Sequence, residues 1–225
     1  QLCRDTHLLR LMRTASERLI PPPTHTVLMQ CSPSQVGTPL HPVVDWLRRE
    51  IATAPGTDDH ERLRSWLGSD ARGPELALMA EFLSIPVPAG EAPAPMPPDR
   101  KRPLTRDILV RHVQARCAEG AVLWLVEDAH WMDGATEDFL VALFSRLRRE
   151  PLMALITTRP ERSYHWAEAH RCTDVVLYPL ARADAQRLLD ATCRGRPLPD
   201  SVREKILART DGVPLFIEEL TTTVL

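Results

Sequence analysis

Residues 121–133 have the sequence AVLWLVEDAHWMD, an apolar run that ends in two adjacent carboxylates. The apolar run is too short for a buried helix and follows Gly120, which predicts a strand buried on both faces of a parallel sheet. Glu127 and Asp128 then stand at the carboxyl end of that strand, where open α/β sheets bind their ligands. Carboxylate oxygens suit Mg²⁺, and a second carboxylate can position or deprotonate a water molecule. The alternative is a buried strand whose acidic end only caps the next helix.

The composition of the 225 residues is that of an ordinary globular protein. Hydrophobic residues make up 44% and charged residues 26%, which predicts one large domain, alone or with a small satellite. The formal net charge of −2 gives no global electrostatic reason to bind nucleic acid or an anionic membrane. The five cysteines are scattered and form no C-x-x-C pair, as in proteins whose thiols stay reduced. We therefore expect a cytoplasmic protein that binds neither nucleic acid nor membrane directly.

Strand and helix patterns alternate along the chain. Short β-prone runs predict further strands at 26–29, 152–156 and 174–177. Helical spacing of apolar residues predicts helices at 6–19, 41–51, 61–67, 75–83 and 105–118, and another that begins after Asp133 as its N-cap. Only helical patterns follow Leu180. The order predicts an α/β fold, with a parallel sheet flanked by helices and a small helical domain behind it.

The segment from 85 to 103 is crowded with proline: IPVPAGEAPAPMPPDRKRP. Proline lacks a backbone donor and fixes its own φ angle, so such a segment suits neither a regular helix nor a central strand. We expect an exposed, partly extended insertion at about 85–104. A proline-rich interaction motif is the alternative.

Three motifs in this order resemble one family: VEDAHWMD at 126–133, ITTRPE at 156–161 and ARTDGVPLFIEEL at 208–220. They are similar to the ATPase domain of the signal-transduction NTPases with numerous domains (STAND), a branch of the P-loop ATPases related to the AAA class. The resemblance is to predicted bacterial ATPases that accompany class III adenylate or guanylate cyclase domains and tetratricopeptide repeats. Large LuxR-type transcriptional regulators carry a similar module. The segment CSPSQVGTPLHPVVDWL at 31–47 also matches, so the resemblance spans nearly the whole chain.

The resemblance implies a role for each matched residue, with ATP and Mg²⁺ as cofactors. Glu127 matches the Mg²⁺-linked Walker B acid, and Asp128 matches the neighbouring acid at the metal, which orients or activates the attacking water. Thr158 and Arg159 match the nucleotide-binding sensor position, where a polar or cationic group meets the γ-phosphate; this makes Asp128 and Arg159 the expected catalytic residues. Pro214 matches the lid proline that packs near adenine. Without the resemblance, Arg159 is expected in a surface ion pair and Pro214 only at a helix start.

The Walker A P-loop is the part of the family pattern that this sequence lacks. The motif G-x-x-x-x-G-K-[ST] needs a lysine directly after glycine. The only lysines, Lys101 and Lys205, follow other residues, and the glycine spacing from Gly68 to Gly73 continues into Pro74. We expect either a fragment that begins just after the P-loop or a degenerate P-loop remnant in the sequence QLCRDTHLL.

Two classes of function follow from these motifs. Residues 1–178 are expected to form a P-loop-type ATPase core without its first strand and Walker A, and residues 179–225 the start of a helical lid. The first function is an ATP-binding and ATP-hydrolysing switch in a multidomain bacterial signalling protein, whose partners are a cyclase or DNA-binding domain and tetratricopeptide repeats of the same polypeptide. The alternatives are an inactive pseudo-ATPase scaffold and the ATPase part of a LuxR-type regulator. Alone, the fragment is expected to be inactive.

Overall fold

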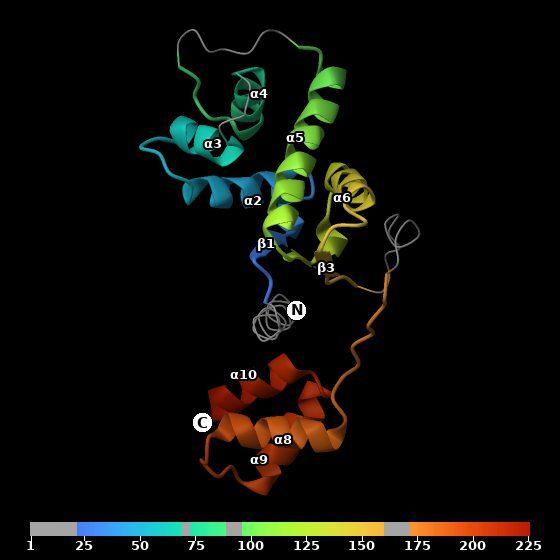
Figure 1. The fold of residues 1–225 in the computed structure, drawn as a ribbon. Helices are drawn as coiled ribbons and strands as arrows, with labels where there is room; N and C mark the ends of the chain where they lie inside the picture. The colour runs from blue at the N-terminus through green and yellow to red at the C-terminus, as the bar shows by residue number, and fades with distance from the viewer. Residues whose placement is uncertain (1–21, 69–72, 89–95, 160–171) are drawn as a thin grey trace. The chain divides into compact units, whose positions relative to one another are not determined.

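The computed structural model describes residues 22–68, 73–88, 96–159 and 172–225 (Figure 1). The described residues divide into two compact units, the larger ending at Arg159 and the smaller beginning at Cys172. The helix predicted at 6–19 lies outside the described residues. No helix in the described ranges has both the length and the apolar character needed to cross a membrane.

A parallel sheet lies at the centre of the larger unit, and its described strands have the order β1-β2-β3. The strands are β1 (His25–Gln30), β2 (Val122–Glu127) and β3 (Leu152–Ile156). They confirm the strands predicted at 26–29, 121–126 and 152–156. All six residues of β2, the central strand, are buried. In the register of the sheet, Gln30 pairs with Glu127 and Val126 with Ile156. Because the strands are also parallel, their carboxyl ends lie at one edge of the sheet.

The helices of the larger unit confirm most of the predicted pattern. They are α2 (His41–Ala52), α3 (Asp59–Leu67), α4 (Gly73–Leu83), α5 (Pro98–Glu119) and α6 (Gly134–Arg146) (Figure 1). Their apolar stripes join one core with alternate residues of the strands. Trp124 of β2 is fully buried there, with its ring 5.0 Å from that of Trp46 and 6.5 Å from that of Phe144. Aromatic pairs of this kind add about 0.5–1.5 kcal/mol to the burial itself.

The other face of the sheet has a smaller apolar cluster. Leu123 and Leu125 of β2 are 5% and 2% exposed, and Leu28 and Leu155 of the neighbouring strands pack against them. Successive side chains of a strand point to opposite faces. Burial of both sets therefore confirms that β2 is covered on its two faces.

The end of the proline-rich segment is helical, which corrects part of the predicted insertion at 85–104. α5 begins at Pro98 and contains Pro103. A proline at the start of a helix loses no hydrogen bond, because the first N–H groups have no partner within the helix. Pro103 does remove one bond, yet the 22-residue helix continues past it and buries Ile108, Leu109 and Val113.

The strand predicted at 174–177 is wrong. Residues 172–180 belong to no strand, and the side chains of Val175, Val176, Leu177 and Tyr178 are 64–79% exposed. A β-prone sequence forms a strand only where a neighbouring strand satisfies its backbone groups. None of the described strands pairs with this segment.

The smaller unit is helical and has its own core. Its helices are α8 (Arg182–Cys193), α9 (Asp200–Thr210) and α10 (Pro214–Val224). The core consists of Ala185, Leu189, Cys193, Ile206, Leu207 and Ile217. Gly212 has a φ of +70°, and a Cβ there would lie 2.4 Å from the carbonyl oxygen of Leu180. The glycine before the predicted lid proline is thus required by close backbone packing.

A half-buried carboxylate, Glu50, joins three helices of the larger unit. Trp46 Nε1 donates to Oε1 at 2.9 Å, and Trp66 Nε1 donates to Oε2 at 3.1 Å. His112 Nε2 lies 3.5 Å from Oε2, and its ring stacks on Trp66 with 3.8 Å between centroids. Burial raises the pKa of this carboxyl, but its contacts with His112, Trp66 and Trp46 outweigh that effect and lower the pKa from 4.5 to about 2.

We expect Glu50→Gln to lower the free energy of unfolding at pH 7 by about 2–3 kcal/mol, because the new NH₂ group cannot accept an indole N–H. The folded pKa lies below the unfolded one, so the carboxylate contributes fully above pH 4.5 and loses its contribution as pH falls toward 2. Urea unfolding at pH 7 and pH 3 measures the effect, and the difference between wild type and variant should shrink at pH 3.

The matched control is Asp45→Asn, which removes one charge from the same helix at a half-exposed pair with Arg49. Exposed pairs of this kind contribute about 0–1 kcal/mol. If Glu50→Gln caused the same loss at both pH values, the depressed pKa would be contradicted.

Candidate functional site at the carboxyl edge of the sheet

The two predicted acids lie where β2 ends. Glu127 is the last residue of β2 and is 5% exposed, and Asp128 follows at 8% exposed. Asp128 has left-handed backbone angles, φ 54° and ψ 42°. Aspartate and asparagine tolerate this region better than most residues. The left-handed residue turns the chain sharply out of the strand, so two neighbouring carboxyl groups occur at one buried corner.

Thr157 holds that corner from the next strand. The N–H of Asp128 donates to Thr157 Oγ1 at 3.1 Å, within a buried pair. The backbone of Thr157 donates to the Val126 carbonyl at 2.9 Å and accepts from the N–H of Ala129 at 2.9 Å. Sequence reasoning assigned the sensor position to the next two residues and missed Thr157. The doubled threonine in ITTRPE was the available signal, but it does not say which hydroxyl points to Asp128.

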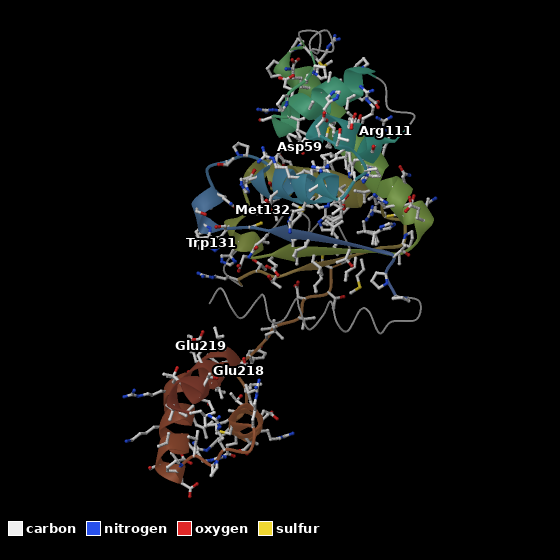
Figure 2. The ribbon with its side chains drawn as sticks, turned by 90° about the vertical axis from the view of Figure 1, so that its left-hand side faces the viewer. Asp59, Arg111, Trp131, Met132, Glu218 and Glu219 are labelled. Carbon is white, nitrogen blue, oxygen red and sulfur yellow. The ribbon has the colours of Figure 1, made fainter. Side chains whose placement is uncertain are left out.

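The two predicted sensor residues lie on the same edge. Thr158 is exposed, and its hydroxyl donates to the Arg159 carbonyl at 3.3 Å. The Arg159 guanidinium carbon lies 5.7 Å from the centroid of the Trp131 ring, and Figure 2 shows Trp131 beside the ends of the strands. A cation over an indole face gains about 0.5–1 kcal/mol at an exposed site. The structure thus places a cationic side chain against the loop that carries the acids.

His130 adds a titratable group beside Asp128. Its Nδ1 lies 3.9 Å from Asp128 Oδ1, and the two side chains are only 9% and 11% exposed. The ring centroid lies 5.0 Å from that of Trp131. An imidazole ring thus lies beside the Asp128 carboxyl group at this buried corner.

The structure brings four of the five predicted site residues to one edge: Glu127, Asp128, Thr158 and Arg159. The fifth, Pro214, is the first residue of α10 and belongs to the smaller unit. The helix start expected for Pro214 is confirmed. Its predicted contact with adenine stays a prediction.

The carboxylates of Glu127 and Asp128 are the donors at this edge that could bind a metal ion. Within the described ranges, no group of three or more His, Cys, Asp or Glu side chains could hold a metal ion. A cation held by Glu127 and Asp128 alone would have two protein carboxylates as ligands and would complete its shell with water or phosphate oxygens. Mg²⁺ is usually bound in this way. Carboxylate oxygens are hard ligands of the kind that Mg²⁺ prefers, so the chemistry of the two acids fits this ion.

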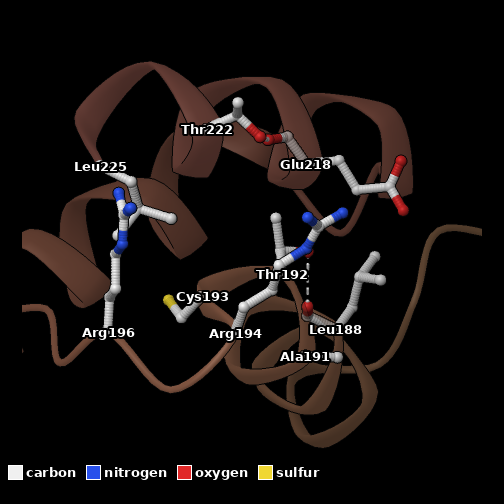
Figure 3. Close-up of a pocket in the computed structure, with 9 residues that line it drawn as sticks. All are labelled: Leu188, Ala191, Thr192, Cys193, Arg194, Arg196, Glu218, Thr222 and Leu225. Carbon is white, nitrogen blue, oxygen red and sulfur yellow. Dashed lines mark hydrogen bonds between the residues drawn. The ribbon is translucent and has the colours of Figure 1, made fainter.

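An open groove of about 810 Å³ in the smaller unit is the other candidate for a binding site (Figure 3). It lies between the ends of α8 and α10 and is lined by Leu188, Ala191, Thr192, Cys193, Arg194, Arg196, Glu218, Thr222 and Leu225. Its lining comes from the C-terminal halves of both helices, where cationic side chains such as Arg194 and Arg196 are favourable beside the partial negative charge of a helix terminus. The lining has no grouping of residues that indicates chemistry.

Comparison with known proteins yields a relative without a described activity. An uncharacterized protein of Rhizobium meliloti (strain 1021) is 26% identical to this chain over 218 residues. The match covers 94% of this chain and 21% of the relative, so the chain spans about a fifth of that protein's length. No protein-family model matches the sequence, and no solved structure matches it.

We expect Thr157→Val to lower the free energy of unfolding by about 1–3 kcal/mol, because valine keeps the shape but leaves the buried N–H of Asp128 without its acceptor. Thr158→Val is the control, since Thr158 is exposed and its hydroxyl donates to the carbonyl of the adjacent Arg159. Urea unfolding of both variants measures the difference. Equal stability of the two variants would show that the Thr157 hydroxyl does not hold the turn.

Proposed function

We propose that this chain is the P-loop-type ATPase core, with the first helices of its lid, of a multidomain bacterial signalling protein that uses ATP binding and hydrolysis as a switch. One observation carries the proposal. Two buried adjacent carboxylates end the central parallel strand, and Arg159 follows the neighbouring strand at the same edge. This combination of acids and a cation suits a nucleotide phosphate with its metal.

The chemistry assigns each residue a separate task. Glu127, deeper in the strand end, would hold Mg²⁺ through its carboxylate or through bound water. Asp128 would contact the same shell and orient or deprotonate the attacking water. Arg159 and Thr158 would stabilise charge on the γ-phosphate oxygens. Bound Mg²⁺ supplies the remaining neutralisation of phosphate charge.

The backbone at Asp128 supports the catalytic assignment. A non-glycine residue in the left-handed region costs of order 1 kcal/mol and persists only where its surroundings hold it. Here the N–H of Asp128 donates to the Thr157 hydroxyl, and the N–H of Ala129 donates to the Thr157 carbonyl. The two bonds fix the backbone on either side of the Asp128 Cα. Strain of this kind clusters at functional sites, because it directs a side chain to a required position.

We place the Walker A P-loop outside these 225 residues, with residues 1–178 as the core and 179–225 as the start of the lid. The motif is absent from the sequence, and a relative that matches nearly the whole chain is about five times longer. The partners we propose are domains of the same polypeptide: tetratricopeptide repeats and an output domain, either a cyclase or, as in LuxR-type regulators, a DNA-binding domain. The setting would be cytoplasmic.

A pseudo-ATPase scaffold is the second candidate: it would keep the same fold but have no P-loop lysine anywhere in the full-length protein. The two functions differ in the full-length native protein. A switch ATPase binds ATP at micromolar concentration and turns it over, whereas a scaffold binds none. Measurement of ATP binding and phosphate release by that protein therefore decides between them.

In the full-length native protein, we expect Asp128→Asn to leave ATP binding nearly intact and to lower hydrolysis by about 10²-fold or more, the usual effect of losing a general base. Asparagine tolerates the left-handed backbone, so folding is preserved. Phosphate release under saturating ATP measures the effect. Asp138→Asn, an exposed acid of α6, is the matched loss of one charge. Unchanged turnover in Asp128→Asn would remove that residue from catalysis.

Residues 1–225 expressed alone should bind ATP no tighter than millimolar and should be poorly soluble. The chain has no P-loop lysine. β3 has β2 as its only partner among the described strands, and Met153 on it is 58% exposed. Unpaired strand edges invite aggregation, and exposed apolar surface forgoes roughly 25 cal/mol per Å². Calorimetric titration with Mg·ATP and sedimentation test both points. A monodisperse monomer with micromolar affinity would contradict the proposed need for a P-loop outside the chain.

A further inference from the structure

Asp133 connects two loops that leave the same edge of the sheet. Its Oδ1 accepts the N–H of Thr136 at 3.0 Å, which caps α6, and also the N–H of Leu40 at 3.2 Å, 93 residues away in sequence. Its Oδ2 accepts the Thr136 hydroxyl at 2.5 Å. The carboxylate thus serves three donors. Only the bond from Leu40 reaches outside the loop and helix to which Asp133 belongs.

The two loops are joined at their other ends as well. Loop 31–40 begins with Cys31, whose N–H donates to the Glu127 carbonyl at 3.0 Å. The second loop, 128–133, begins one residue further at Asp128. One hydrogen bond therefore ties the loops where the strands end, and another ties them where α2 and α6 begin. Between these two ties lies Asp128, the proposed catalytic acid.

Leu40 shows that the second tie constrains the backbone. It is the residue before α2 and has left-handed angles, φ 59° and ψ 16°, although it carries a branched side chain. A leucine adopts this region only where the surroundings hold it. The hydrogen bond to Asp133 is the side-chain contact that fixes its amide. Both loops thus contain one left-handed residue held by a hydrogen bond.

We propose that Asp133 is a positioning residue: by accepting the Leu40 amide it holds loop 31–40 and loop 128–133 as one unit and so fixes the position of Asp128. Its catalytic consequence rests on the proposed ATPase function, but the mechanical link does not. The role differs from helix capping, because a cap requires only the bond to Thr136. Two substitutions separate the roles. Serine caps a helix but is too short to reach a second donor as well, whereas asparagine has an oxygen in the same place.

The test is amide hydrogen exchange of the full-length native protein, read on peptides that cover 31–40, 128–133 and α6. In Asp133→Ser we expect exchange about tenfold faster in both loops, as for loss of one hydrogen bond, and unchanged exchange in α6. In Asp133→Asn all three should match the wild type. If Asp133→Ser changes neither loop, or loosens α6 as much as the loops, the link is overturned.

Turnover supplies the second readout. We expect Asp133→Ser to lower kcat for ATP hydrolysis about tenfold with KM for ATP nearly unchanged, and Asp133→Asn to restore kcat, because misplacement of a catalytic group affects the chemical step. Loosened loops with an unchanged kcat would overturn the positioning role. Absence of hydrolysis in the wild type would overturn the proposed function alone, and the exchange data would still decide whether Asp133 links the loops.

Discussion

A strand buried on both faces can carry ionisable groups only at its ends, and this constraint organises the larger unit. β2 has no exposed residue, so its first charged side chains come where the chain leaves the sheet. Removing such groups from water is costly unless donors compensate them. At the end of β3, the Thr157 hydroxyl accepts the backbone N–H of Asp128 and so fixes the turn that carries both acids. The buried strand β2 thus determines where the two acids lie, and the end of β3 determines the geometry of the turn that carries them.

The sequence was informative wherever a residue's own pattern decides its structure. The apolar run before Glu127 predicted β2, and Asp133 was predicted as an N-cap, which its bond to the Thr136 amide confirms. Contacts between distant segments could not be predicted. The choice of Thr157 over Thr158, and the reach of Asp133 to Leu40, depend on how loops far apart in sequence pack together.

The errors have a related cause. The run 174–177 has strand-forming side chains, but a strand also requires a partner, and no local pattern supplies one. The helix from Pro98 was excluded by its prolines, although packing along the rest of α5 outweighs the loss at Pro103. The low pKa of Glu50 likewise follows from no local pattern. Its two indole partners come from different helices, so its low pKa is a property of the assembled fold.

The two hydrogen bonds that join loops 31–40 and 128–133 also bear on the number of residues that loop 31–40 can have. Loop 31–40 has to span a fixed distance between the hydrogen bond from Cys31 and the one from Leu40, so an inserted or deleted residue has to be absorbed by the backbone between these two bonds. Most surface loops accept such changes at small entropic cost. In homologous chains that keep Glu127 and Asp128, loop 31–40 should therefore vary less in its number of residues than in its side chains.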